Sequence, residues 1–86
     1  MIKYEKVYVS VEIKVDTQGY ENLLSLEWED GRIFFIDKTL SERMSPPAHV
    51  GAVLTKRYDV VIEGRERTLY RETTTNRWFV EKPLII

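Results

Sequence analysis

The feature that most constrains the fold of this chain is a run of strict alternation between residues 7 and 15. β-Branched residues occupy every second position of the run: Val7, Val9, Val11, Ile13 and Val15. Successive side chains of a strand point to opposite faces, so the run predicts a half-buried strand. A helix would scatter the same residues around its circumference. Residues 16–19 (DTQG) supply turn chemistry directly after it.

The rest of the chain predicts five more short strands, separated by turn signals. They are expected at about 22–29, 32–37, 56–63, 67–73 and 77–82, with Pro83 stopping the last one before an apolar tail. Residues 39–44 are ambiguous. Thr39 and Glu42 fit the capping box of a short helix, whereas the apolar spacing also fits one long bent strand, which we favour. Residues 46–55 are expected to form the longest loop.

Residues 27–37 (EWEDGRIFFID) predict a hairpin that turns at Asp30-Gly31. Asp-Gly between two alternating runs favours a two-residue type I′ turn. That register places Leu26 opposite Phe35, Trp28 opposite Ile33 and Glu29 opposite Arg32. The alternative is a cation loop built on the acids at 27, 29 and 30. A calcium loop needs acids at its first, third and fifth positions and a closing glutamate, and that pattern is missing.

Several short strands with turn signals about every 8–12 residues predict an all-β fold. In a chain of 86 residues the natural solution is a small six-stranded, SH3-like or OB-like, partly open barrel, because closure removes exposed edges. We expect a single β-barrel domain over residues 1–86. The alternative is a small β-sandwich with one short helix near 39–44.

Composition narrows the function further. The chain has no cysteine and one histidine, so we expect no cofactor and no metal site. Its net charge is −1, which argues against strong nonspecific binding to nucleic acid. Charges near the start and the lack of a long apolar run lead us to expect a cytoplasmic protein without a membrane partner. A chain of this mass folds to roughly 5,300 Å² of surface, so nearly every apolar stripe must be buried, here or against a partner copy.

Basic and aromatic residues concentrate in the last third of the chain. The candidate partner-binding residues are Arg65, Arg67, Arg71, Arg77, Tyr70 and His49. Spacing lets Arg65, Arg67 and Arg71 share one face of a strand. Arginines beside aromatic residues on a β-surface suit single-stranded nucleic acid. The more ordinary interpretation, which we favour, is ion pairing across strands with the nearby acids. The spacing of Ser45 and His49 is compatible with a serine–histidine dyad, because such sites are recognised by geometry, but an exposed loop histidine is expected.

Three stretches carry a resemblance to a known family: WEDGRIFFID (28–37), RYDVVIEGRERTLY (57–70) and RWFVE (77–81). The chain resembles a family of small uncharacterised proteins of Gram-positive bacteria with a tryptophan–DGR hairpin and a closing RWFVE strand. The resemblance implies a shared fold. Some relatives lie beside genes for Y-family DNA polymerases, so the resemblance implies a DNA-repair or translesion-synthesis context without catalytic residues. The family implies a glycine-rich central loop, where this chain has SPPAHVGAVLT.

The function predicted from the sequence is therefore a small non-catalytic binding module. Its expected partner is another protein, or a second copy in a homo-oligomer, bound through the charged 65–77 face, the 45–55 loop or the C-terminal tail. The alternative is a nucleic-acid-binding accessory protein that acts through Arg65, Arg67 and Arg71. We do not expect an enzyme.

Overall fold

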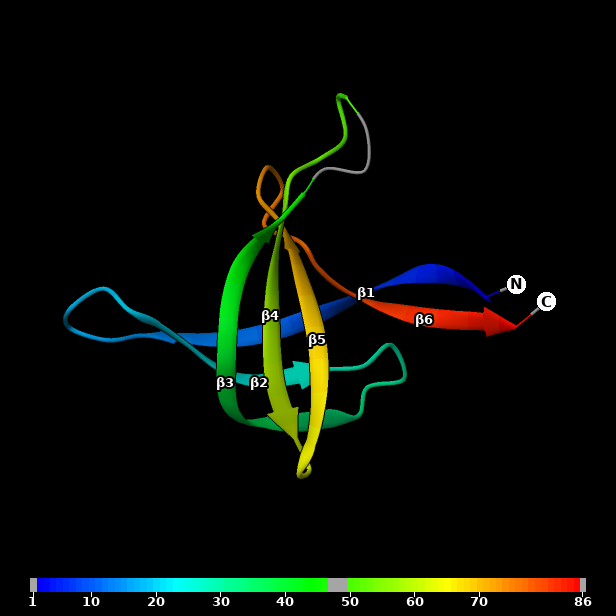
Figure 1. The fold of residues 1–86 in the computed structure, drawn as a ribbon. Coiled ribbons are helices and arrows are strands. Elements are labelled where there is room, and N and C mark those ends of the chain that lie inside the picture. Colours follow the sequence, from blue (N-terminus) through cyan, green and yellow to red (C-terminus); the bar gives the residue numbers. More distant parts are fainter. Residues whose placement is uncertain (1, 47–49, 86) are drawn as a thin grey trace.

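The computed structural model describes residues 2–46 and 50–85. Six antiparallel strands follow one another in chain order around a closed barrel, and β6 pairs with β1 to complete the ring (Figure 1). The strands are β1 (Ile2–Val15), β2 (Glu21–Glu27), β3 (Ile33–Ser45), β4 (Thr55–Ile62), β5 (Arg65–Glu72) and β6 (Trp78–Ile85). The all-β, six-stranded prediction is confirmed. The finer SH3-like or OB-like assignment stays a prediction.

The hydrophobic core fills the inside of the ring with alternate side chains of the strands. β4 contributes Tyr58 and Val60, and Tyr58 is paired with Leu69 of β5. Trp78 of β6 packs its ring on Tyr58, with centroids 4.9 Å apart. Val60 and Leu69 have almost no exposed surface. Tyr58 and Val60 are two residues apart, as expected for side chains on one face of a strand.

β3 is one long strand, so the alternative with a short helix near 39–44 is wrong. β3 pairs with β4 from Ile36 to Ser45, and the register skips Asp37 and Leu40. Such β-bulges bend a strand and increase its twist, which lets β3 curve around the barrel (Figure 1). A six-residue helix could not replace the backbone hydrogen bonds that this pairing supplies.

The Asp30-Gly31 hairpin exists, but its predicted register is wrong by one residue. Leu26 is paired with Phe34 instead of Phe35. The amide of Trp28 donates to the carbonyl of Arg32 (2.8 Å), so the loop has three residues and ends at a glycine with positive φ. Asp-Gly suits this type I turn with a bulge as well as the type I′ turn that we expected. A one-residue shift turns every side chain over, so Phe34 faces inward and Phe35 is 73% exposed.

The two-residue turn is found instead between β4 and β5. Glu63 and Gly64 both have positive φ, 52° and 74°, and the flanking residues Ile62 and Arg65 are paired. These are the features of a type I′ hairpin, in which glutamate is an uncommon first residue. The sequence marked a turn at Gly64, and the glutamate before it gave no signal of this type.

The last strand is longer than predicted. β6 continues past Pro83 and stays paired with β1 to the pair Ile2–Ile85. Proline is tolerated in a strand that has a partner on one side only. Figure 1 shows β1 and β6 leaving the barrel together as a two-stranded ribbon. The exposed surface is 6450 Å² and the radius of gyration is 13.5 Å, larger than the roughly 5,300 Å² and 12 Å of an average chain of this size.

Candidate binding cleft between the fifth and sixth strands

The ring of strands has its shortest ladder between β5 and β6. Within the described ranges, β5 pairs with β6 only through Tyr70 and Arg71, whereas it pairs with β4 along its whole length. β6 then follows β1 away from the barrel (Figure 1). We call the lower end of this two-pair ladder, at the pair Tyr70–Phe79, the fork. Below the fork, the edge of β5 from Arg65 to Leu69 lacks a neighbouring strand, and a cleft of about 920 Å³ lies beside it.

The inner wall of the cleft combines apolar and basic side chains. Leu69 is buried in the core, so strand alternation points Arg65 and Arg67 toward the same inner face. Val80 packs against the core from β6, and alternation places Lys82 on its side of that strand. Between the strands, the floor is formed by Leu26, Trp28, Phe34 and Ile62. On β5 and β6, the charged side chains that line the cleft from the inner face are therefore all cationic.

The outer rim of the cleft has the opposite charge. Thr68 donates a hydrogen bond to Asp59 (3.2 Å), with which it is paired on the face of the sheet opposite to Leu69, so even-numbered residues of β5 belong to the outer face. Glu66 shares that face, and Glu81 lies on the outer face of β6 next to the buried Phe79. Carboxylates therefore flank the cleft outside, while guanidinium groups and a lysine line it inside.

The side chains of the two inward arginines of β5 have no partner in the part of the chain that the structure describes. Across residues 2–46 and 50–85, neither the Arg65 nor the Arg67 side chain makes a hydrogen bond or an ion pair, and both residues are exposed. Arg32 also lines the cleft, but its Nε donates to Asp30 (2.6 Å). The predicted cross-strand ion pairing with nearby acids is thus not made by Arg65 and Arg67, and their donors are available.

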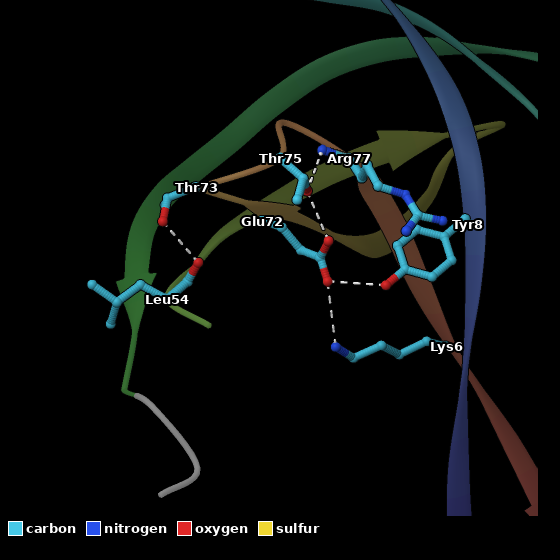
Figure 2. Close-up of polar contacts among 7 residues, drawn as sticks. All are labelled: Lys6, Tyr8, Leu54, Glu72, Thr73, Thr75 and Arg77. Atoms are coloured by element: carbon cyan, nitrogen blue, oxygen red, sulfur yellow. Dashed lines mark hydrogen bonds and ion pairs between the residues drawn. The ribbon is translucent and has the colours of Figure 1, made fainter. Parts of the chain in front are cut away.

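Above the fork, the structure is pinned by the carboxylate of Glu72 (Figure 2). Glu72 is buried and accepts hydrogen bonds from Thr75 Oγ1 (2.8 Å) and from the hydroxyl of Tyr8 (3.0 Å). Lys6 Nζ lies 3.6 Å away. The hydrogen bond from Thr75 is the main cause that holds the pKa of Glu72 below its usual value, and Tyr8 and Lys6 add to it against the opposing effect of burial. One carboxylate thereby links β1, β5 and the turn before β6.

Arg71 occupies the inside of the barrel above the fork. Its Nη1 donates to Glu21 (3.0 Å) and its guanidinium lies 5.1 Å from the ring centroid of Trp78. Its Nε is buried without a hydrogen-bond partner in the described part of the chain. Arg71 therefore differs from Arg65 and Arg67, although the three share one face of β5, because the ring is closed where Arg71 sits.

An aromatic row crosses the outer surface at the fork. Phe79 is buried between Tyr70, which stacks on it at 5.1 Å, and Tyr8, whose ring meets it edge-on at 6.0 Å. Lys6 lies 4.6 Å from the Phe79 centroid, and Arg77 lies 3.5 Å from that of Tyr8. Aromatic pairs and cation–π contacts stabilise neighbouring strands beyond simple burial. The row fastens β1, β6 and β5 at the level where the β5–β6 ladder ends.

The structure separates the residues that the sequence grouped as partner-binding. Arg65 and Arg67 lie together in the cleft, and Tyr70 stands at the fork beside it. Arg71 and Arg77 lie above the fork, on the inner and outer faces respectively. His49 falls outside the described residues, so its predicted role stays a prediction.

Sequence reasoning missed Trp28, Phe34 and Lys82 as lining residues. The wrong hairpin register hid Phe34, and Lys82 stood at the end of the strand expected over 77–82. The signal that was available is the parity of the two strands, since Lys82 is an even step from Trp78 and Arg67 an even step from Leu69. What no pattern revealed is that the two strands separate.

Comparisons with protein-family models, with curated proteins and with solved structures found no significant match. The resemblance to the Gram-positive family stays a prediction. In residues 2–46 and 50–85 no group of three or more histidine, cysteine, aspartate or glutamate side chains is arranged to hold a metal ion. The same residues include no helix long and apolar enough to span a membrane.

Proposed function

We propose that this protein is a non-catalytic binding module that accepts an extended segment of a protein partner in the cleft between β5 and β6. The observation that carries the proposal is the open edge of β5 beside an apolar floor. An edge strand presents unpaired backbone N–H and C=O groups, and an extended peptide pairs with such groups by strand addition.

Backbone chemistry favours β5 over β6 as the template. β5 consists of RERTLYRE, with an N–H at every position, whereas β6 includes Pro83, which has none. The floor supplies Trp28 and Phe34, which are aromatic side chains of the kind enriched in binding sites. The β5 edge and the floor together give an incoming strand both a ladder and an apolar surface.

The contacts above the fork and the charges below it both favour an open cleft between β5 and β6. The aromatic row and Glu72 fasten the strands above it, whereas Arg65 and Arg67 would bring like charges close to Lys82 if β5 and β6 closed below it. Repulsion among these inward cations would therefore disfavour closure of the two strands below the fork.

A peptide selection tests this proposal. A displayed library of random peptides would be panned against the protein, and enriched peptides titrated into the labelled protein by two-dimensional amide NMR. We expect the largest shifts at residues 65–69 and 80–82, and a loss of binding in Arg65→Ala/Arg67→Ala. Arg43→Ala, an exposed strand arginine on β3, is the matched control. Enriched peptides that all shift residues outside the cleft would contradict the proposal.

A second candidate is single-stranded nucleic acid, favoured by one observation: two free arginines share the cleft with Trp28 and Phe34. Stacking platforms beside basic groups bind single strands. Such binding weakens steeply with salt, with a slope set by the phosphates contacted. A titration with single-stranded DNA at about 50 mM salt that shows no shift would eliminate this candidate.

A further inference from the structure

Charge alternates with strand parity around the cleft. Arg65 and Arg67 face inward from β5, and Glu66 between them faces outward. Across the cleft, Lys82 faces inward from β6 and Glu81 faces outward. The cleft therefore has a basic inner side and an acidic outer side, and a straight count of its charges would hide this pattern.

A strand that added to the β5 edge would meet the two sides in turn. In a β-ladder, directly opposite residues point to the same face. Every second residue of the incoming strand would thus stand beside Arg65 or Arg67, and the residue between them would stand beside Glu66. A carboxylate is the complementary group at the inward positions, where each arginine presents several N–H donors and no partner in the described ranges.

We infer that the segment bound in this cleft is an extended acidic strand with carboxylates at alternate positions, spaced to meet Arg65 and Arg67. The residues between the carboxylates are neutral or basic, because they face Glu66 and Glu81. This inference rests on the proposed function, since it names the chemistry of the segment that the open edge of β5 accepts.

The same pattern disfavours a nucleic-acid strand at this site. A phosphate backbone carries no N–H and C=O groups at strand spacing, so it leaves the β5 edge unpaired. It is also negative at every nucleotide, so it would place charges against the rim acids as well as against the arginines. An acidic peptide avoids this repulsion because its side chains alternate between two faces.

Three capped peptides of about ten residues distinguish the effect of alternating carboxylates from the effect of total charge. The first alternates glutamate with threonine. The second has the same composition in two blocks, five glutamates followed by five threonines. The third alternates glutamine with threonine and is neutral. Each is titrated into the labelled full chain at moderate salt, with binding followed through the amide signals of residues 65–69.

We expect the alternating acidic peptide to bind roughly tenfold more tightly than either of the others. The neutral peptide brings no carboxylate to the arginines, and the glutamate block that reaches both arginines also places a carboxylate beside Glu66. Equal binding by the block peptide would show a response to charge alone and overturn the inference. Equal binding by the neutral peptide with shifts in the cleft would overturn the inference and leave the proposed function standing. An absence of cleft shifts with all three peptides would overturn both. Binding of oligothymidylate at the same amides with equal affinity would assign the site to nucleic acid.

Charge reversal supplies an independent check. Arg65→Gln and Arg67→Gln should each weaken the alternating acidic peptide several-fold without changing the neutral one, and Arg43→Gln should change neither. Arg67→Glu should bind a peptide that alternates lysine with threonine more tightly than the original protein does. Unchanged selectivity in Arg67→Glu would contradict the assigned register. The melting temperature of each variant shows whether its fold is retained, which is expected for exposed side chains.

Discussion

The two sides of the fork differ in what their charged residues do. Above it, Arg71 and Glu72 are held by partners from other strands, and the aromatic row lies across the joint. Below it, Arg65 and Arg67 lie on the same strand and have no partner in the described ranges. The difference teaches that position in a ring of strands, rather than residue type, decides whether an arginine supports the fold or is available to a ligand.

The largest effect is expected from the phenylalanine at the fork. Phe79→Ala should reduce the free energy of unfolding by about 3–5 kcal/mol, because it removes a fully buried ring and leaves Tyr8 and Tyr70 without their shared contact. Chemical denaturation measures this change. The matched control is Phe35→Ala, since Phe35 is largely exposed and its loss should change stability by less than about 0.5 kcal/mol. Similar losses at both positions would remove the distinction between the two regions.

A smaller loss is expected from the buried carboxylate. Glu72→Ala should cost about 2–3 kcal/mol, because Thr75 and Tyr8 lose a charged acceptor and Lys6 loses its partner. Glu66→Ala on the cleft rim is the control and should be nearly neutral. Thermal unfolding of both variants tests the comparison. A Glu66 variant as unstable as the Glu72 variant would mean that the rim is also part of the structural support.

Acid should destabilise the fold through Glu72, which lies above the fork, and through Asp59 of β4, which is paired with Thr68. Asp59 accepts hydrogen bonds from Ser41 (2.8 Å) and Thr68 and lies beside Arg57, and the bond from Ser41 is the main cause that lowers its pKa below 3.8. The pKa of Glu72 is likewise below 4.5. A lowered pKa in the folded state means that the unfolded chain takes up the proton first, so the stabilisation is complete above these ordinary values and is lost as pH falls through the folded values.

Unfolding free energies measured from neutral pH down to about pH 3 check this expectation. The free energy of unfolding should decrease as the pH is lowered below about 4.5. Glu72→Gln should make this decrease smaller. A profile that is identical for the original chain and for Glu72→Gln would show that Glu72 does not contribute to acid sensitivity.

The smallest effect on stability is expected in the cleft. Arg65→Ala and Arg67→Ala should change the free energy of unfolding by less than about 0.5 kcal/mol each, because neither side chain has a partner within the described ranges. A stabilisation in the double variant would fit relief of repulsion with Lys82. A loss above about 1 kcal/mol would show that these arginines support the fold, against the role proposed for them.

Local patterns predicted much of this fold, since alternation and turn residues located six strands and the parity of β5 placed Arg65, Arg67 and Arg71 on one face. The errors arose where two local solutions were compatible with the same residues. Asp30-Gly31 suits both a two-residue and a three-residue loop, and the choice was made by burial of Phe34 and Ile36 on the inner face. β-Propensity alone does not distinguish these solutions, because it describes fit to a half-buried surface.

The cleft was beyond the reach of such patterns because it depends on pairing between distant strands. Nothing in RERTLYRE or RWFVEKPLI states that their ladder ends after two pairs. The β5–β6 ladder is short because β6 stays paired with β1 beyond it. This pairing joins the first and last parts of the chain. Some residues of the candidate site could thus be predicted from the sequence. Their arrangement in space could not, because it depends on how the six strands close into a ring.

Amide hydrogen exchange along β5 tests the central claim, that its ladder to β6 ends at the fork, most directly. In a strand paired on one side, alternate amides point to the free side and exchange quickly. Between Arg65 and Leu69 we therefore expect protection to alternate from residue to residue, whereas Tyr70 to Glu72 should be protected without interruption. Uniform strong protection from residue 65 to residue 72 would mean that β6 pairs with β5 throughout, and the cleft would not exist.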